Sequence, residues 1–297
     1  MRVGAAHLWQ RMLSHLPWRL RSRNNFMMAS ANWYFNKVRL TPPRRVTVNA
    51  PLELHALVCH RDVNMMLTCA KSLIRYLPEA SLVLHDDGST TDEDRHLFEH
   101  HLPGVWFITR AESDAAMKLA LPAEVFEKRQ SYFFLLKLFD VNYFNRGQRT
   151  VLIDSDLLFI SKPQEIVDWA QAATVVPFYN RDPKPTYRSV HVPPGAELPP
   201  HFNAGFIGFD GRFGMEELWR CCQNIDYWLE DQTVYTALLA GRGARALDRE
   251  RYCVYTGEPL SPKTAMLHFI STNRFKSLLY PRLARVVYKD VTGMARG

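Results

Sequence analysis

The sequence predicts an α/β protein with a single mixed, mostly parallel sheet flanked by helices. Two observations carry this prediction: short apolar runs alternate with amphipathic runs, and clusters of acidic residues follow two of the apolar runs. The chain has 297 residues, of which 47% are hydrophobic and 23% are charged. These are ordinary values for a globular protein, and the length favours one α/β domain of roughly 250 residues with terminal segments.

The elements follow one another in the order typical of α/β proteins. Apolar runs predict strands, and runs with a helical period predict helices between them. Parallel strands covered by helices bind ligands beyond their carboxyl ends, where the acidic clusters at Asp86 and Asp154 fall. The Pro-rich residues 182–200 are expected to form a loop over such a site. Strands are predicted at residues 54–59, 81–85, 105–108 and 150–153, and helices at residues 64–76, from residue 92, and at residues 131–145.

Basic charge is concentrated at the start of the chain. Residues 1–50 contain nine Lys and Arg and no Asp or Glu, so the net charge of +7 comes from this segment. Within it, Leu8, Met12, Leu16 and Leu20 share one side of a potential helix, although Pro17 would kink it. We therefore separate a basic segment at residues 1–45, a candidate membrane-surface helix, from a catalytic domain at residues 46–297. A transit peptide and a helix packed on its own domain are the alternatives.

Composition also limits the location and partners of the protein. No run approaches the roughly 18 to 20 apolar residues of a membrane span, so we expect a soluble or peripheral protein. The five cysteines are odd in number and show no metal-ligand spacing, which favours reduced thiols in the cytoplasm. Nucleic acid is not an expected partner, because the basic charge does not extend over the domain.

Asp154, Ser155 and Asp156 form the strongest candidate for chemistry. A D-x-D triplet alone is weak evidence, since about one is expected by chance in this composition. A second triplet, at residues 92–94, lies in a charged run and is most simply the start of a helix. Asp154 and Asp156 instead stand between apolar runs, where carboxylates are costly unless they are paired or bind a cation. Carboxylate oxygens suit Mg²⁺ or Mn²⁺, which also bind diphosphate; a structural ion pair is the alternative.

The segment Ile-Asp-Ser-Asp-Leu-Leu-Phe resembles the D-x-D motif of the retaining glycosyltransferases of family eight, which have the GT-A fold. Further stretches match in the family's order. The resemblance implies metal ligation by Asp154, Asp156 and His268, the last within Leu-His-Phe. The remaining matches are Lys137, the F-N-A-G segment with Asn203, Ala204 and Gly205, and the Asp231-Gln232 pair.

The resemblance also implies roles for these residues. Lys137, Ser155 and the F-N-A-G segment would contact the donor, and Asp231 and Gln232 would lie near the anomeric carbon of its sugar. The alternatives without a role in catalysis or binding are a snorkelling lysine at position 137, a plain turn at residues 203–205 and a core histidine at position 268.

Two features depart from family eight. The Gly-x-x-Lys-Pro-Trp motif expected after the histidine is replaced by residues 271–276, in which Arg274 or Lys276 would bind the diphosphate. In addition, residues 86–90 (Asp-Asp-Gly-Ser-Thr) resemble a segment of the mostly inverting family two, in which an aspartate such as Asp86 or Asp87 contacts the nucleobase. An Asp-Gly turn is the alternative. The stereochemistry of transfer is therefore left open.

The sequence as a whole predicts a metal-dependent glycosyltransferase. It would move a sugar from a nucleoside diphosphate sugar, such as a UDP-sugar, to a hydroxyl of a glycan, lipid-linked or protein acceptor, with Mn²⁺ or Mg²⁺ as cofactor. With inversion, Glu230 or Asp231 would be the general base. The alternatives are a phosphohydrolase of the haloacid dehalogenase type, in which Asp154 is the nucleophile, and an inactive nucleotide-binding scaffold.

Overall fold

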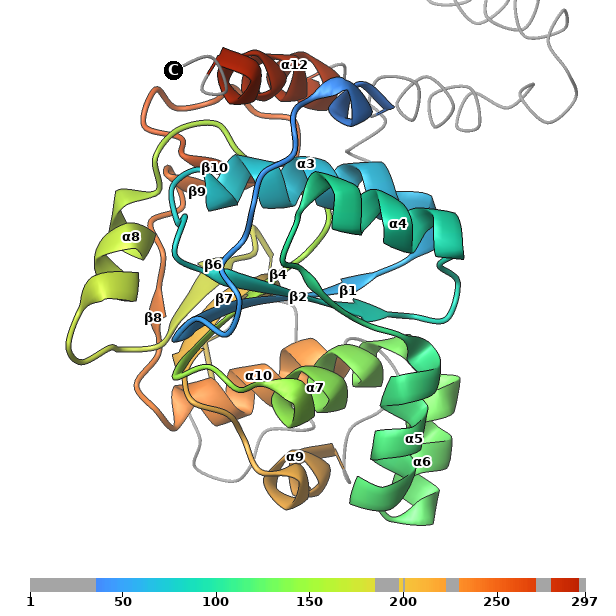
Figure 1. The fold of residues 1–297 in the computed structure, drawn as a ribbon. Helices are drawn as coiled ribbons and strands as arrows, with labels where there is room; N and C mark the ends of the chain where they lie inside the picture. The colour runs from blue at the N-terminus through green and yellow to red at the C-terminus, as the bar shows by residue number, and fades with distance from the viewer. Residues whose placement is uncertain (1–35, 185–197, 200, 223–229, 271–278, 294–297) are drawn as a thin grey trace, which may run out of the picture.

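The computed structural model describes residues 36–184, 198–199, 201–222, 230–270 and 279–293. A seven-stranded sheet separates two layers of helices (Figure 1). Helices α3 and α4 cover one face and α7 and α10 the other, while α12 lies on the outer side of α3. The bounds are α3 Val63–Ile74, α4 Asp92–His101, α5 Arg110–Ala120, α6 Ala123–Ser131, α7 Phe133–Phe144, α8 Gln164–Gln171, α9 Met215–Cys222, α10 Glu230–Ala240 and α12 Leu279–Gly293.

The large sheet is mixed, as predicted, with the order β3-β2-β1-β4-β7-β6-β8. Strands β3, β2, β1 and β4 are mutually parallel, whereas β7 runs antiparallel to both β4 and β6. A small sheet, β5-β10-β9, lies beside it, with β10 antiparallel to β5. The strands are β1 Leu52–Val58, β2 Ser81–Asp86, β3 Trp106–Ile108, β4 Arg149–Ile153, β5 Leu157–Phe159, β6 Phe178–Arg181, β7 Phe202–Asp210, β8 Arg245–Ala246, β9 Tyr252–Val254 and β10 Met266–His268.

The local sequence explains why these elements form. Strands β1, β2 and β4 are almost wholly buried, as expected for parallel strands covered by helices on both faces. Helix α4 begins with a capping box, in which Thr91 and Asp94 bond each other's backbone N–H groups. The triplet at residues 92–94 is therefore a helix start, as the sequence predicted.

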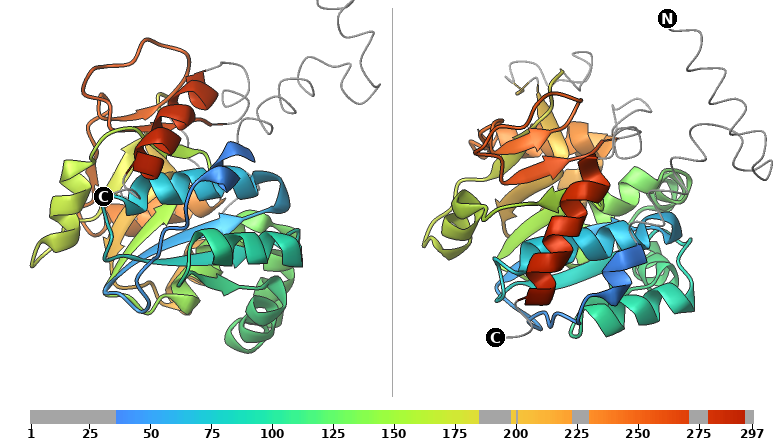
Figure 2. Two further views of the ribbon diagram at one scale, coloured as in Figure 1. Left: turned by 45° about the horizontal axis from the view of Figure 1, so that its top comes forward. Right: turned by 90° about the horizontal axis from the view of Figure 1, so that it is seen from above.

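The ends of the chain are described only in part. Residues 1–35, which contain the predicted membrane-surface helix, lie outside the described residues, as does most of the predicted loop at residues 182–200. The described chain begins with a short 3-10 helix, η2 (Asn36–Leu40), which contacts α3 (Figure 2). Within the described ranges, every helix is too short or too polar to cross a membrane.

Candidate active site

The turn at residues 154–156 joins the two sheets. It follows β4 and precedes β5, so the chain leaves the large sheet here and enters the small one. The N–H of Asp154 donates to the carbonyl of Gly205 on β7 over 2.8 Å, and the N–H of Phe269 donates to the carbonyl of Asp156 over 3.0 Å. Backbone bonds to segments more than 40 residues away therefore fix the directions of both aspartates.

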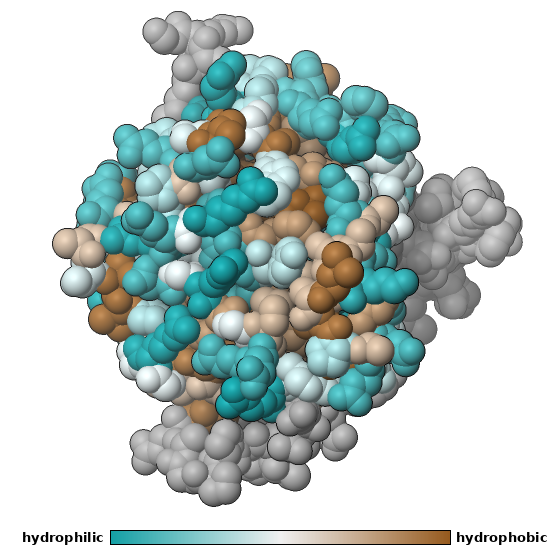
Figure 3. Space-filling view, turned by 60° about the horizontal axis from the view of Figure 1, so that its bottom comes forward, coloured by the Kyte–Doolittle hydropathy of each residue, from teal (hydrophilic) through white to brown (hydrophobic). Residues whose placement is uncertain are grey.

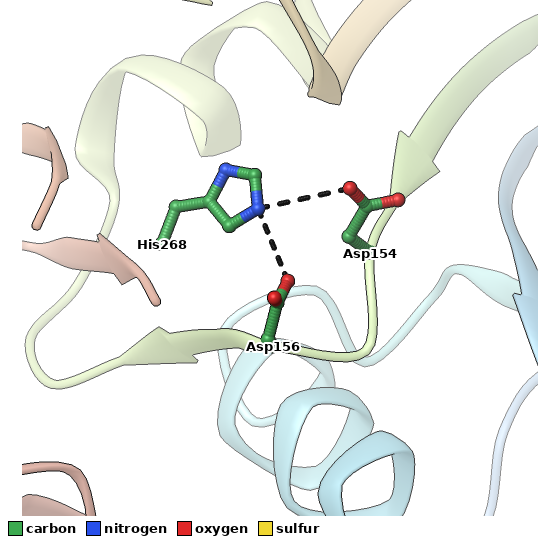
Figure 4. Close-up of side chains that lie close together, drawn as sticks. All are labelled: Asp154, Asp156 and His268. Atoms are coloured by element: carbon green, nitrogen blue, oxygen red, sulfur yellow. Dashed lines mark ion pairs between the residues drawn. The ribbon is translucent and has the colours of Figure 1, made fainter. Parts of the chain in front are cut away.

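The turn brings Asp154 and Asp156 to His268, the last residue of β10 (Figure 4). Because β10 is antiparallel to β5 with His268 opposite Leu157, the imidazole lies directly over the turn. Its Nε2 is 3.0 Å from Oδ1 of Asp156 and 3.7 Å from Oδ2 of Asp154. Burial lowers the pKa of His268, but the two carboxylates outweigh burial and raise it above its ordinary value.

These three side chains fit a divalent cation. One ligand atom from each lies within 4.8 Å of the others. Two carboxylate oxygens and one imidazole nitrogen form a donor set suited to Mn²⁺ or Mg²⁺. Gly205 faces the group without a side chain: a Cβ there would lie 2.6 Å from Oδ2 of Asp154 and closer still to Cε1 of His268. A glycine at this position therefore keeps the space beside the candidate ligands open.

Lys137 of α7 completes the charge balance of the site. Its Nζ lies 2.7 Å from Oδ1 of Asp154, 3.0 Å from the carbonyl of Ala204 and 3.5 Å from Oδ2 of Asp231. The side chain is buried, so it does not extend to solvent like a snorkelling residue. Burial lowers the pKa of Lys137, but the carboxylates of Asp154 and Asp231 outweigh burial and raise it above its ordinary value. The side chain therefore stays in the ammonium form.

Asn203 and Ala204 lie on β7, and Gln232 lies in the first turn of α10. The Asn203 amide donates to Asp182 over 2.9 Å, and its Oδ1 accepts the N–H of Gly205 over 2.9 Å. Gln232 Oε1 accepts the N–H of Ala204 over 3.4 Å, while its buried Nε2 has no hydrogen-bond partner among the described residues. An unsatisfied buried donor at a cavity wall is a group that a ligand can satisfy.

The second acidic cluster forms a tight turn after β2. Asp86 Oδ1 accepts the N–H groups of Gly88 and Thr90, and Asp87 Oδ1 accepts both the N–H and the hydroxyl of Ser89. Gly88 has φ +98°, a conformation that favours glycine. The carboxylate of Asp86 thus stabilises the turn by accepting its N–H groups, whereas Asp87 and Ser89 line the cavity described next.

One cavity of about 980 Å³ holds most of these groups. Its size suits a drug-sized or larger small-molecule ligand. Sequence reasoning missed several wall residues: Cys59, His60, Arg61 and Asp62 after β1, Phe133 and Phe134 at the start of α7, Asp182 after β6, and Ile270. The residues at 59–62 could have been found from their place at a strand's carboxyl end. The predicted residues that line it are Asp87, Lys137, Asp154, Ser155, Asp156, Asn203, Ala204, Gly205, Asp231, Gln232 and His268.

Three predicted residues are not placed. Arg274 and Lys276 lie outside the described residues, and Glu230 begins α10 with a side chain that is likewise not described.

Solved structures of glycosyltransferases share this fold. The galactosyltransferase LgtC, in complex with donor and acceptor sugar analogues, matches 79% of this chain and 95% of its own with 13% identity and a TM-score of 0.52. The glycosyltransferase GlyE of Streptococcus pneumoniae matches 82% of this chain and 63% of its own with 15% identity and a TM-score of 0.52. The bifunctional glycosyltransferase WbbM matches 82% and 51% with 16% identity and a TM-score of 0.51.

No family model matches the sequence, and no curated protein matches it. The likeness to solved structures at these identities establishes the fold. The chain has the GT-A fold of nucleotide-sugar glycosyltransferases, as the sequence predicted.

Proposed function

We propose that this protein is a metal-dependent glycosyltransferase that moves a sugar from a nucleoside diphosphate sugar to an acceptor hydroxyl. The observation that carries the proposal is the grouping of Asp154, Asp156 and His268 beside Lys137, in one cavity at the carboxyl edge of a GT-A sheet. The fold alone does not fix an activity. The chemistry of these four side chains, which suits a diphosphate with its cation, supports the assignment.

The residues of the chain supply binding and charge balance. A divalent cation held by the triad would offset negative charge on the leaving diphosphate. Lys137 places a second, permanent positive charge at the same wall of the cavity. Asn203, Ala204 and Gln232 present backbone and amide groups that can orient the donor sugar.

The roles of several further residues belong to the proposal. Asp87 and Ser89 line the cavity at the end of β2, a position suited to the nucleoside, and UDP is the nucleotide that the family resemblance favours. Arg274 and Lys276 would contact the diphosphate. Asp231, or Glu230 beside it, would act as the base if transfer inverts configuration, whereas Asp231 or Gln232 would flank the reacting carbon if transfer retains it.

The acceptor would be a glycan, a lipid-linked saccharide or a protein, with the enzyme acting in the cytoplasm at a membrane surface. The alternative in which Asp154 is the nucleophile of a phosphohydrolase is disfavoured. Its Oδ1 is bonded to Lys137, and the fold is that of glycosyltransferases. An inactive nucleotide-binding scaffold remains the second candidate. The Nε2 of Gln232, which has no hydrogen-bond partner among the described residues, could bind a nucleotide in the cavity without any catalysis.

The test is a thermal-shift and donor-hydrolysis screen with nucleoside diphosphate sugars, with and without Mn²⁺. The wild type is compared with Asp156→Ala and with Asp92→Ala, which alters the exposed first residue of the D-x-D triplet at the start of α4. We expect the wild type and Asp92→Ala to be stabilised by a donor only with the metal, and Asp156→Ala to lose this response.

Two other outcomes would reject the proposal. Stabilisation by nucleotide without metal and without hydrolysis would favour the scaffold. Metal-dependent release of phosphate from simple phosphomonoesters, with no response to any donor, would favour the phosphohydrolase.

A further inference from the structure

The turn after β2, which lines the cavity through Asp87, is held by one side chain of α5. Arg110, the first residue of α5, donates from Nη1 to the carbonyl of Asp87 over 3.1 Å, and its backbone N–H donates to Oδ2 of Asp86 over 3.4 Å. Its aliphatic stem lies against the same turn, since a Cβ at Gly88 would be 3.3 Å from Cγ of Arg110. Arg110 therefore contacts three successive residues of the turn.

The guanidinium of Arg110 also joins the turn to helices α5 and α6. Nε donates to Oδ1 of Asp114, one helical turn further along α5, over 2.7 Å, and Nη2 donates to the side-chain carbonyl of Gln130 on α6. The donors can reach three different segments because they stand on separate nitrogen atoms in a rigid plane, unlike the donors of a lysine. A single side chain thus ties the cavity turn to two helices.

Asp114 continues this connection to α7. Its Oδ1 also accepts from Nη1 of Arg129 over 2.6 Å, and the side chain of Arg129 is wholly buried. Arg129 in turn bonds Asp140 of α7 through Nε and Nη2, over 2.6 and 2.7 Å. Asp140 lies one helical turn after Lys137 on the same helix. We call Arg110, Asp114, Arg129 and Asp140 the ion-pair chain, because together they join the cavity turn to the helix that carries Lys137.

The ion-pair chain lies outside the cavity. Its four residues, all within the described part of the structure, are absent from the cavity wall. Helices α5 and α6 lie together beside the sheet (Figure 1), on the side of the molecule seen in Figure 3. Hydrophilic and apolar side chains mix there in small patches, as on most protein surfaces. An effect of these residues on a ligand in the cavity would therefore act through the position of the turn or of α7.

We infer that Arg110 is a positioning residue for the nucleotide, which sets the Asp87 turn relative to α7 so that nucleoside and diphosphate are bound together. The inference rests on the proposed function, in which this turn contacts the nucleoside and Lys137 the diphosphate. Lys137 has its own bonds to Asp154 and Ala204, so it keeps its place without Arg110. The turn likewise keeps its internal hydrogen bonds and loses only its connection to α5 and α6.

The test compares the binding of two probes, measured by calorimetry in the presence of Mn²⁺. The first is UDP, or GDP if the wild type binds GDP more tightly, and it would contact both ends of the site. The second is pyrophosphate, which would contact only the candidate metal group and Lys137. Arg110→Met should weaken nucleotide binding by about 10-fold, as expected for the loss of one hydrogen bond from a charged donor, and leave pyrophosphate binding unchanged.

Asp114→Asn removes the charge at the centre of the ion-pair chain without touching the turn, and it should also weaken nucleotide binding alone. The double variant with Arg110→Met should bind the nucleotide no more weakly than Arg110→Met, because both changes break one connection. Arg220→Met is the matched control, since it breaks an ion pair of the same spacing with Glu216 on α9. It should bind both probes like the wild type. Urea unfolding checks that each protein is folded.

Equal nucleotide affinity of the wild type and Arg110→Met would overturn the inference. A parallel loss of nucleotide and pyrophosphate binding would also overturn it, because the variant would then disturb the whole site. If Arg110→Met does not fold, Asp114→Asn decides by the same two comparisons. Failure of the wild type to bind UDP or GDP with Mn²⁺ would instead reject the proposed function, and the inference with it.

Discussion

Lys137 and Asp154 form an ion pair in which only one of the two carboxylate oxygens of Asp154 contacts the lysine. Oδ1 of Asp154 accepts from Nζ of Lys137 over 2.7 Å, whereas Oδ2 faces Nε2 of His268 at 3.7 Å. The same Nζ lies 3.5 Å from Asp231 on α10. Lys137 therefore holds the D-x-D turn and α10 together, while Oδ2 of Asp154 is directed at His268 of the candidate metal group.

Lys137→Met tests this arrangement. The variant leaves buried Asp231 and half-buried Asp154 without their cation, which costs about 3 kcal/mol of folding free energy. Donor hydrolysis should fall by about 100-fold or more, because a fixed positive charge at the diphosphate is lost. Urea unfolding and steady-state kinetics measure the two effects. Lys118→Met, on the exposed side of α5, should change neither; an active Lys137→Met enzyme would contradict the role.

Gly205→Ala should disable the candidate metal site. The new Cβ would lie 2.6 Å from Oδ2 of Asp154, a separation that forces the carboxylate or the His268 ring to move. We expect the Mn²⁺-dependent rise in melting temperature to disappear, with donor hydrolysis reduced about 100-fold. Gly214→Ala is the matched control, since a Cβ there meets no atom within 4 Å. If both variants respond to Mn²⁺ like the wild type, the cation does not bind beside Gly205.

The helix that carries Lys137 is itself anchored by a buried ion pair. Arg129 of α6 bonds Asp140 of α7 in a bidentate manner, with Nε to Oδ1 at 2.6 Å and an Nη to Oδ2 at 2.7 Å, and both side chains are fully buried. Arg129→Met should lower the free energy of unfolding by about 3 to 5 kcal/mol, because it strands the charge of Asp140. Arg220→Met, which breaks only an exposed pair with Glu216, should cost less than about 1 kcal/mol. Equal midpoints in urea would mean that Asp140 is not held as an ion.

His101, at the end of α4, should make stability depend on pH. Its Nδ1 lies 3.0 Å from Nζ of buried Lys71, and burial together with this cation lowers the pKa of His101 from 6.5 to about 4. Between pH 6.5 and about pH 4, His101 is therefore protonated in the unfolded chain but not in the folded chain. Stability is full above pH 6.5 and is lost as pH falls from about 6.5 towards 4, by at most about 1.4 kcal/mol per pH unit.

His101→Asn keeps an acceptor for Lys71 but cannot titrate. We expect its unfolding free energy to fall less steeply over this pH range than that of the wild type. His96→Asn, an exposed histidine on the same helix, should follow the wild-type curve. Parallel curves for all three proteins would show that His101 is protonated in the folded state.

The sequence predicted strands β1 to β4 and helices α3, α4 and α7, because their apolar runs are local signals. It predicted no strand at β7 or β10 and no helix at α10, which carry Asn203, His268 and Asp231. It could also place the D-x-D turn, since a carboxylate pair between two apolar runs stands out. It could not show that His268 lies opposite Leu157, because strand register between β5 and β10 joins segments about a hundred residues apart. Asp182 was missed for a similar reason: its role depends on Asn203, which reaches it only when β6 pairs with β7.

Asp231→Asn tests a residue whose role differs between the two stereochemical alternatives, inversion and retention. The Asp231 carboxylate is buried beside Lys137, and burial raises its pKa although Lys137 acts in the opposite direction. Because the Asp231 carboxylate pairs with buried Lys137, we expect its main role to be the balance of that charge. The variant should therefore keep measurable activity, reduced about 10- to 100-fold. Asp87→Asn, in the turn after β2 that lines the cavity, should instead raise the KM for the donor with little change in kcat. The anomeric configuration of the product, measured by proton NMR, completes the test. A fully inactive Asp231→Asn enzyme, together with an inverted product from the wild type, would assign Asp231 as the general base.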